Sequence, residues 1–434
     1  MSKNKSYQMS KVVKQFNSDQ KRFLTSQIVG STYNILITGA LVTGFLLYMG
    51  IPIYYAGLLM SIPMLANVAQ VLIDHIWNYF PKSGRMISVM VLSARLLILT
   101  IVFVPVLLHI SDLSSSHVTA MRIVGVAAIW LPAYILSAGS GIRMNFWMVS
   151  TFPAEYSSAL LAYRDRIVIG ISSVLSFIIA YYIDSLSGTK NEFYGYVLVF
   201  AIACMISITD FIILKDVKNT NAIEKKEEKP FVKCVRDIRD NKNFLRFECY
   251  IFLLNFSINM ANPYFNAYMI DRLHLKYVSI MFLTILLAVT EIAVAGLWGK
   301  IGTEVTWGRI LKWVTTVLGV QFIVWAFVTA QSVGLIIVIY ITSGLIATGL
   351  SAAQFMLPYH YIGKENVFTY MSAHTAVVAL GGFVGSVAGS LIISTLKNLN
   401  FFVLGFPFSS MQVNMLVSGF LILITTVYVP RVCK

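Results

Sequence analysis

The sequence predicts an all-α membrane protein with twelve transmembrane helices, arranged as two pseudo-symmetric halves of six helices each. Three observations support this fold class. The 434 residues are 57% hydrophobic and only 12% charged, a balance that soluble domains of this length do not have. Apolar runs of about 20 residues, each long enough to cross a bilayer, recur along the chain. Polar residues in the first and seventh runs repeat at one spacing, as an internal duplication would leave.

Each apolar run is interpreted as one span, because a bilayer admits backbone only where its polar groups bond internally. The predicted spans are 24–48, 55–77, 86–110, 119–142, 160–184, 193–214, 246–270, 276–299, 310–331, 333–356, 370–395 and 412–430. They define a basic tail (1–23), an N-terminal six-helix half (24–214), a linker (215–245) and a C-terminal six-helix half (246–434).

The distribution of the 33 Lys and Arg residues predicts which helix ends face the cytoplasm. With the N-terminus inside, most of them fall in the tail, the linker and the inner loops, in agreement with the positive-inside bias. The inverted topology would place this basic excess outside. We therefore expect a multi-pass protein of the cytoplasmic membrane with both termini in the cytoplasm. The same distribution explains the net charge of +14 without a nucleic-acid partner.

The segments outside the spans carry no catalytic or metal-binding pattern. The tail is polar and basic, so we expect it to lie against anionic lipid headgroups. The first span is too long for a signal-peptide core and is interpreted as retained. Cys204, Cys234, Cys249 and Cys433 map to spans or to the inner face and lack the spacing of metal ligands.

A stripe of four asparagines lies in the seventh span, and a matching polar stripe lies in the first. The asparagines are spaced i, i+4, i+7 and i+11, which places them on one helical face. Each is 228 residues after a polar residue of the first span. The pairs are Gln27 with Asn255, Ser31 with Asn259, Asn34 with Asn262, and Thr38 with Asn266. Lipid cannot bond these groups, so they must face protein, a polar cavity or both.

The sequence between the two halves predicts a linker followed by a helix on the membrane surface. Residues 215–230 are charged and end in Pro230. After this proline, Phe231, Cys234, Val235 and Ile238 fall on one helical face, with charged residues opposite. This pattern predicts a short amphipathic helix on the inner membrane surface.

Two further patterns recur in both halves. A Gly-Arg pair leads into an apolar helix after spans two and eight, at Gly84-Arg85 and Gly308-Arg309. Span four carries Trp130, Tyr134, Ser137 and Gly141, and span ten repeats this spacing with Tyr340, Gly344, Ala347 and Ser351. Twelve spans in two sets of six, a basic linker and these Gly-Arg loops resemble the major facilitator superfamily of secondary transporters.

The sequence departs from this family's motifs at several positions. Trp77 and Pro81 stand where the loop signature after span two has glycine and aspartate. Arg122 and Gly125 are only roughly similar to the span-four pattern of proton-coupled members. The glycine-proline signature of drug–proton exporters in span five is absent, and residues 170–173 stand in its place. This departure disfavours proton-driven drug export.

The resemblance implies that spans one, four, seven and ten surround a central cavity. Carboxamides both donate and accept hydrogen bonds without a fixed charge, which suits a polar solute, and aromatic rings add stacking surfaces. The alternative is that these side chains only join neighbouring helices by hydrogen bonds. The predicted lining consists of Gln27, Ser31, Asn34, Thr38, Trp130, Tyr134, Asn255, Asn259, Asn262, Asn266 and Tyr340.

A proline and a group of glycines predict how the helices bend and pack. Pro263 interrupts the asparagine stripe and removes a backbone donor, so span seven is expected to bend there. The freed carbonyls either contact a ligand or mark a simple bend. In span eleven, Gly381, Gly382, Gly385 and Gly389 predict close helix approach rather than chemistry.

Few charged side chains lie deep within the spans, and charges at such depth are paired or functional. Glu291 of span eight is expected to pair with Arg164 or Arg166 as an inner gate, because the resemblance implies that span eight lies against span five. The alternatives are a carrier of the coupled proton and a structural ion pair. Snorkelling or packing is the favoured interpretation of Arg95. For His374 a structural role is favoured, with titration near neutral pH as the alternative.

The sequence favours transport over catalysis. It shows no nucleophile–base pair, phosphate-binding loop or metal cluster, so neither an enzyme nor a cofactor is expected. We expect a monomeric secondary active transporter that moves a small polar organic solute across the cytoplasmic membrane by alternating access, with a proton or sodium ion as coupling ion. Two alternatives stay open: an exporter of a drug, peptide or metabolite, and a transporter-like sensor or assembly partner that binds without transport.

Overall fold

The structure is a computed structural model and is almost entirely helical in the residues that it describes. These are residues 13, 16–77, 84–108, 115–152, 157–217, 238–362, 367–398, 401–403 and 406–432. Ten helical segments in these ranges are long and apolar enough to cross a membrane. Two predicted spans, 55–77 and 246–270, are not among the ten: a shorter apolar segment, Ile53–Ala69, overlaps the first, and the second is divided among α12 (Lys242–Ala261), η3 (Asn262–Tyr264) and α13 (Phe265–Asp271).

Contacts between residues divide the chain into two compact units, which are described separately. Unit 1 comprises Met1–Ile51 and Leu72–Lys226, and unit 2 comprises Pro52–Val71 and Glu227–Lys434. The segment Pro52–Val71 packs with unit 2, although the prediction placed it in the N-terminal half. The predicted amphipathic helix after Pro230 falls mostly outside the described residues.

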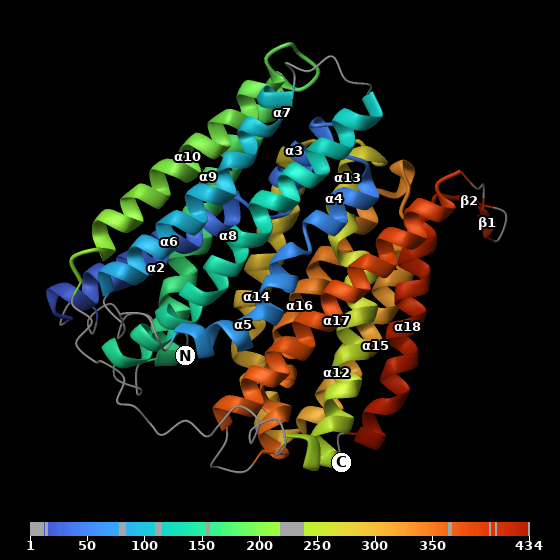
Figure 1. Ribbon diagram of the computed structural model, residues 1–434. Helices are drawn as coiled ribbons and strands as arrows, with labels where there is room; N and C mark the ends of the chain where they lie inside the picture. Colours follow the sequence, from blue (N-terminus) through green and yellow to red (C-terminus); the bar gives the residue numbers. More distant parts are fainter. Residues whose placement is uncertain are drawn as a thin grey trace. The chain divides into compact units, whose positions relative to one another are not determined.

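Unit 1 is built from helices that run beside one another in Figure 1. Its core at one end joins Phe23, Trp147 and Phe152, which are almost fully buried. Asn17 and Gln20 form a capping box that starts the first helix at Ser18, inside the predicted tail. The elements of the unit are α2 Ser18–Leu36, α3 Gly39–Tyr48, α6 Gly84–Leu99, η1 Thr100–Phe103, α7 Val104–Leu108, α8 Ser115–Thr151, α9 Ser157–Leu186 and α10 Glu192–Leu214.

Unit 2 contains long helices and one short hairpin, formed by strands β1 and β2, that the sequence did not predict. The register of the hairpin pairs Phe401 with Phe408 and Val403 with Phe406. The elements are α4 Ile53–Leu59, the start of α5 Ile62–Trp77, α12 Lys242–Ala261, η3 Asn262–Tyr264, α13 Phe265–Asp271, α14 Tyr277–Glu304, α15 Trp307–Ala326, η4 Ala330–Ser332, α16 Gly334–Met356, η5 Leu357–His360, α17 Val367–Leu396, β1 Phe401–Val403, β2 Phe406–Phe408 and α18 Ser410–Val432.

The first predicted span is two helices rather than one. Helix α2 ends at Leu36 and α3 begins at Gly39, whose φ of 68° is in the left-handed region that favours glycine. At the break, Thr38 Oγ1 donates a hydrogen bond to the carbonyl of Asn34 (2.8 Å). The break therefore divides the predicted polar stripe, with Thr38 beyond the end of α2.

Both Gly-Arg pairs place a buried glycine and an exposed arginine at the start of a helix. Gly84 opens α6, and Gly308 is the second residue of α15. A Cβ on Gly84 would lie 2.7 Å from the Trp147 ring, so only glycine fits there. Arg85 and Arg309 are exposed. The predicted repeat is confirmed at the level of local structure.

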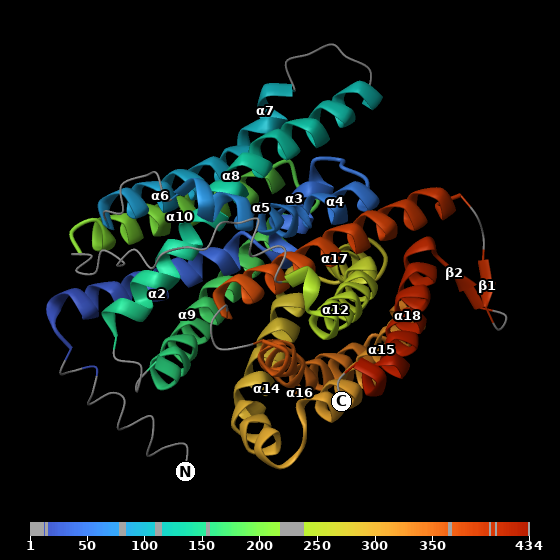
Figure 2. The same cartoon turned by 60° about the horizontal axis from the view of Figure 1, so that its bottom comes forward.

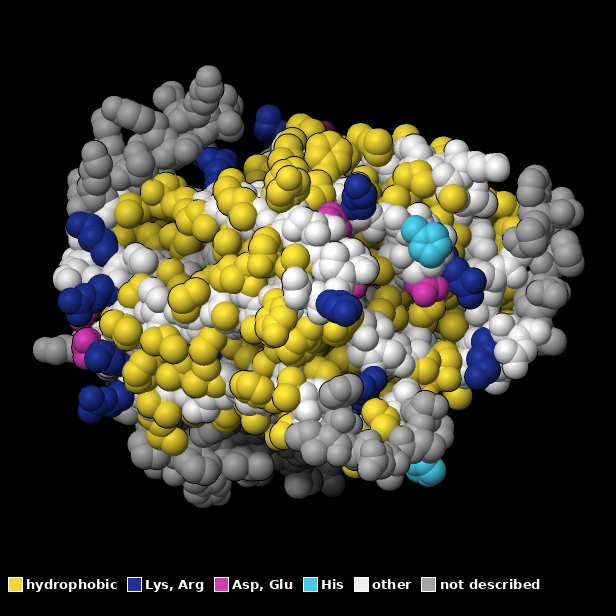
Figure 3. Space-filling view, turned by 90° about the horizontal axis from the view of Figure 1, so that it is seen from above, with side chains coloured by type: hydrophobic (Ala, Val, Ile, Leu, Met, Phe, Trp, Pro, Cys, Tyr) yellow, Lys and Arg dark blue, Asp and Glu magenta, His cyan; other side chains and the backbone are white. Residues whose placement is uncertain are grey.

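The surface of the protein is largely apolar, as expected for a chain in contact with lipid. Figure 3 shows hydrophobic side chains over much of one face, with charged side chains scattered between them. Many large apolar residues are exposed, among them Val174 and Ile178 of α9 and Leu391 of α17. In water such a surface would drive association, whereas in a bilayer it is solvated by acyl chains.

The closest helix packing in unit 2 joins α12 and α17, which lie side by side in Figures 1 and 2. Glycines of α17 face backbone carbonyls of α12. A Cβ on Gly381 would lie 2.7 Å from the carbonyl oxygen of Phe252. A Cβ on Gly385 or Gly389 would overlap the carbonyl oxygens of Phe256 or Met260. The predicted close approach through glycines is therefore confirmed.

Gly385→Ala tests this contact, because its new methyl group would meet backbone that cannot rotate away. We expect a loss of about 1 to 3 kcal/mol in the free energy of unfolding, as for overpacked cores. Thermal unfolding in detergent, followed by tryptophan fluorescence, measures the loss. Gly296→Ala in α14 is the matched control, since a Cβ there meets no atom within 4 Å. Equal unfolding temperatures for the two variants would contradict the packing argument.

Candidate functional site

The break in span seven occurs at Pro263, as predicted, and divides the span into α12, η3 and α13. Pro263 has no N–H, so the carbonyl of Asn259 loses its helical donor. Ser386 Oγ of α17 donates to this carbonyl instead (3.2 Å). Asn414 Nδ2 of α18 donates to the carbonyl of Met260 (2.6 Å), and Ser418 Oγ donates to that of Ser257. Side chains of the neighbouring helices therefore occupy the carbonyls around the bend.

The four asparagines of the stripe fall into two pairs. Asn255 and Asn259 are buried, and each Nδ2 donates to a carbonyl one turn earlier in α12, at 2.9 Å in both cases. Asn262 is exposed in η3 and Asn266 is half-buried in α13. Among the described residues, neither of these two side chains has a hydrogen-bond partner. The bend thus separates internally bonded carboxamides from free ones.

The polar stripe of α2 is mostly without internal partners. Gln27 and Ser31 are half-buried, and Asn34 is exposed. Within the described part of the chain, no hydrogen bond involves any of these three side chains. The polar atoms that the sequence placed on one face of the first span are therefore free to bond a solute or water.

The predicted aromatic residues lie in two clusters, one in each unit. In α8, Trp130 is buried and its ring lies edge-on to that of Tyr134, with ring centroids 5.8 Å apart. In unit 2, Tyr340 of α16 lies edge-on to Trp325 of α15 at 6.5 Å. The Tyr340 hydroxyl contacts Met269 Sδ at 3.7 Å. These rings are packed against protein within their own units.

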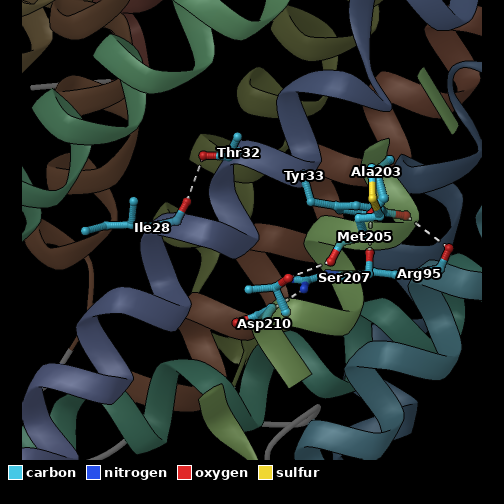
Figure 4. A network of polar contacts seen from close by, with 9 residues as sticks. Ile28, Thr32, Tyr33, Arg95, Ala203, Met205, Ser207 and Asp210 are labelled. Carbon is cyan, nitrogen blue, oxygen red and sulfur yellow. Dashed lines mark hydrogen bonds and ion pairs between the residues drawn. The ribbon is translucent and has the colours of Figure 1, made fainter. Parts of the chain in front are cut away.

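An ion pair that the sequence did not predict joins α6 and α10 in unit 1. Figure 4 shows Arg95 of α6 reaching Asp210 of α10, beside Tyr33 of α2. The Arg95 side chain is 13% exposed and that of Asp210 is 2% exposed. The Tyr33 hydroxyl donates to the Arg95 carbonyl (3.1 Å), and its ring lies 5.0 Å from the guanidinium. Arg95 therefore forms a buried pair rather than snorkelling.

Gly30 allows this ion pair to form against α2. A Cβ on Gly30 would lie 2.5 Å from the Arg95 guanidinium and 3.2 Å from the Asp210 carboxylate. Two other polar residues labelled in Figure 4, Thr32 and Ser207, donate to carbonyls of their own helices. A sequence signal for the pair was present, since Arg95 and Asp210 are opposite charges within predicted spans.

A second buried pair of titratable groups joins α12 and α17 in unit 2. His374 Nδ1 lies 2.9 Å from Glu248 Oε1, and the two side chains are 8% and 6% exposed. The His374 ring stacks on Phe247, with centroids 6.0 Å apart. The other carboxylate oxygen of Glu248 is buried and has no partner among the described residues. The sequence favoured a structural role for His374, with titration as the alternative, and did not predict this partner.

The predicted gating residues lie in different units. Glu291 is half-buried in α14 of unit 2, while Arg164 and Arg166 lie in α9 of unit 1. Within unit 1, Arg164 bonds its neighbour Asp165 through Nε and a terminal nitrogen (2.9 and 2.8 Å), and Arg166 is exposed. The pairing of Glu291 with either arginine stays a prediction.

The long apolar helices of the two units define a polytopic membrane protein. The sequence model of the Major Facilitator Superfamily matches residues 144–386, which is more than half of the chain. The chain belongs to the major facilitator superfamily. No curated protein sequence matches it.

Three solved transporters share the fold at low sequence identity. A bacterial homologue of the iron transporter ferroportin is 14% identical with a TM-score of 0.73, over 96% of this chain and 98% of that one. The nucleoside transporter NupG is 10% identical with a TM-score of 0.66, over 96% and 100%. A D-xylose-proton symporter is 11% identical with a TM-score of 0.65, over 96% and 98%. These identities support the fold alone.

Asp210→Asn tests the ion pair of unit 1, because it leaves the Arg95 charge buried without a counter-ion. We expect the free energy of unfolding to fall by about 3 to 5 kcal/mol. The double variant Arg95→Met with Asp210→Leu removes both charges and should recover most of this loss. Thermal unfolding of the purified protein measures both effects.

Asp271→Asn is the matched control for this prediction. Asp271 pairs with Arg272 at 3.4 Å, but their side chains are 43% and 54% exposed. Removing an exposed pair should cost about 0 to 1 kcal/mol. If Asp210→Asn were no more destabilising than Asp271→Asn, the ion pair would not stabilise unit 1.

Proposed function

We propose that this protein is a secondary active transporter that moves a small polar organic solute across the cytoplasmic membrane by alternating access. In this proposal the protein acts as a monomer. Both of its termini lie in the cytoplasm, because the distribution of Lys and Arg favours this topology. Each solute molecule binds to polar side chains of the membrane helices and is released on the other side. The two units supply the moving parts, as in carriers built from repeated halves.

The observation that carries this proposal is the set of uncharged polar side chains without internal partners. Gln27, Asn34, Asn262 and Asn266 have no hydrogen-bond partner among the described residues. A carboxamide left unbonded in an apolar membrane helix costs free energy, so such groups are retained where water or a ligand bonds them. Each offers a donor and an acceptor, which matches hydroxyl or amide groups of a solute.

The chemistry of these side chains favours an organic solute over a metal ion. The described residues contain no group of three or more His, Cys, Asp or Glu side chains placed to hold a metal. Metal ions in proteins are bound mainly by thiolate, imidazole and carboxylate ligands. The polar solutes named for NupG and for the D-xylose-proton symporter are compatible with carboxamide recognition, although those proteins are related to this chain by fold alone.

Asn34→Ala and Asn262→Ala test the proposal in proteoliposomes screened against a library of sugars, nucleosides, amino acids and small amides. Each variant loses one hydrogen bond to the solute, worth about 1 to 1.5 kcal/mol. Uptake of the transported solute should therefore fall by roughly five- to tenfold. Initial rates of uptake under a solute gradient, with the amount of inserted protein measured in parallel, give the effect.

Thr209→Ala is the matched control, because Thr209 is an exposed polar residue of α10 that bonds the carbonyl of Met205 in its own helix (2.8 Å). Its uptake should equal that of the wild type. Wild-type uptake kinetics in both asparagine variants would contradict the assignment of Asn34 and Asn262 to solute binding. Flux in the outward direction alone would indicate the exporter, and binding with no flux would indicate the sensor.

A further inference from the structure

The buried pair of Glu248 and His374 is the part of unit 2 whose chemistry the proposed solute recognition does not use. Both side chains are more than nine-tenths buried, and they come from different helices. One carboxylate oxygen faces the imidazole, and the other has no partner among the described residues. A buried carboxyl oxygen without a donor is costly when ionised, and binding a proton removes that cost.

The net charge of the pair depends on how many protons it holds. With an ionised carboxyl and a neutral imidazole, the pair carries one buried negative charge, and Nδ1–H donates to Oε1. One additional proton, on the imidazole or on the free carboxyl oxygen, makes the pair neutral overall. A second additional proton would leave a buried positive charge. The neutral pair, which holds one additional proton, is therefore the state that a medium of low dielectric constant favours.

Among the described residues, Glu248 and His374 form an ion pair with each other and with no other group. The titratable neighbours of Glu248 along α12 are Arg246 and Cys249, which are exposed, and Tyr250, which is buried. Two tyrosines contact rings of α12 that precede Glu248: Tyr370 of α17 lies edge-on to Phe244 (4.7 Å), and Tyr361, after η5, stacks on Phe247 (5.2 Å). The described titratable residues at the ends of η5 and α18 are His360 and Tyr428.

We propose that Glu248 and His374 together form a binding site for one proton, and that occupancy of this site is coupled to solute transport. The coupling follows from the position of Glu248 on α12. Glu248 precedes Asn255 by seven residues, so it extends the polar face that continues through Asn259 to Asn262. The coupling, unlike the proton site, rests on the proposed transport function.

The α12–α17 contact gives the proton a means of acting on the solute-binding residues. The same helix pair is joined by Glu248 with His374 at one end and by Ser386 with the Asn259 carbonyl near the bend. Between these points, glycines hold the two helices in backbone contact. A change in the charge of the pair alters the hydrogen bond between Glu248 of α12 and His374 of α17. Because α12 is followed directly by Asn262, this change can reach a proposed solute-binding residue. The proton is taken from bulk water and returned to it, so no further reactant is needed.

Nuclear magnetic resonance of ¹⁵N-histidine-labelled protein in nanodiscs tests the proton site without any solute. The chain contains 6 histidines, and comparison with His374→Gln assigns the His374 signals. Spectra are recorded between about pH 5 and 8, and we expect the His374 ring shifts to change as the site gains or loses its proton. In Glu248→Gln, which keeps a hydrogen-bonding oxygen but cannot ionise, this pH dependence should change. In Glu304→Gln, which alters an exposed carboxyl of α14, it should not.

The wild-type spectra alone decide against the site if the His374 signals do not change over this pH range, even if Glu248→Gln fails to fold. An unchanged titration in a folded Glu248→Gln variant would equally overturn the shared site. Neither result depends on knowing the solute, so failure of the proposed transport function leaves this measurement intact.

Uptake in proteoliposomes tests the coupling once a solute is found. A pH gradient should change the rate of uptake by the wild type and by Glu304→Gln, and this effect should be lost in Glu248→Gln and in His374→Gln. If both variants kept the wild-type response to the gradient, the coupling would be rejected while the proton site could still stand on the resonance data. If Glu291→Gln alone lost the response, the coupled proton would belong to Glu291.

Discussion

The need to satisfy every backbone carbonyl inside a membrane span is the constraint on which unit 2 depends. Pro263 removes the donor for the Asn259 carbonyl, and an unbonded carbonyl in hydrocarbon costs several kcal/mol. Ser386 of α17 and Asn414 of α18 supply the missing donors. Ser386 reaches α12 because glycines of α17 let the two backbones touch. The bend, the close packing and the polar residues of three helices are therefore one arrangement.

This arrangement decides which polar side chains remain for function. The side-chain amides of Asn255 and Asn259, before the bend, donate hydrogen bonds to carbonyls of α12. The side chains of Asn262 and Asn266 have no hydrogen-bond partner among the described residues. In unit 1, a buried ion pair takes up the strong charges of α6 and α10 and leaves uncharged groups of α2 free. Charged side chains thus hold helices together, and neutral ones are available to a solute.

The sequence predicted the parts of the fold that follow from hydropathy, spacing and backbone chemistry. Long apolar runs predicted the helices, Pro263 predicted the bend, and Gly385 with its neighbours predicted the close contact. The break before Gly39 was missed because a glycine within an apolar run does not reveal a positive φ. The pairs Arg95 with Asp210 and Glu248 with His374 were missed because one sequence does not say which helices are neighbours. The division among the asparagines depends on local hydrogen bonds that the i, i+4 spacing permits but does not require.

The central claim is that the carboxamides after the bend bind the solute, while those before it maintain the helix. Equilibrium binding of the transported solute, measured by calorimetry together with the unfolding temperature, tests it most directly in Asn266→Ala and Asn255→Ala. The account predicts that Asn266→Ala weakens binding by roughly five- to tenfold, the worth of one hydrogen bond, at an unchanged unfolding temperature. Asn255→Ala should lower the unfolding temperature and leave the affinity of the folded protein unchanged. The reverse assignment of the two effects would contradict the account.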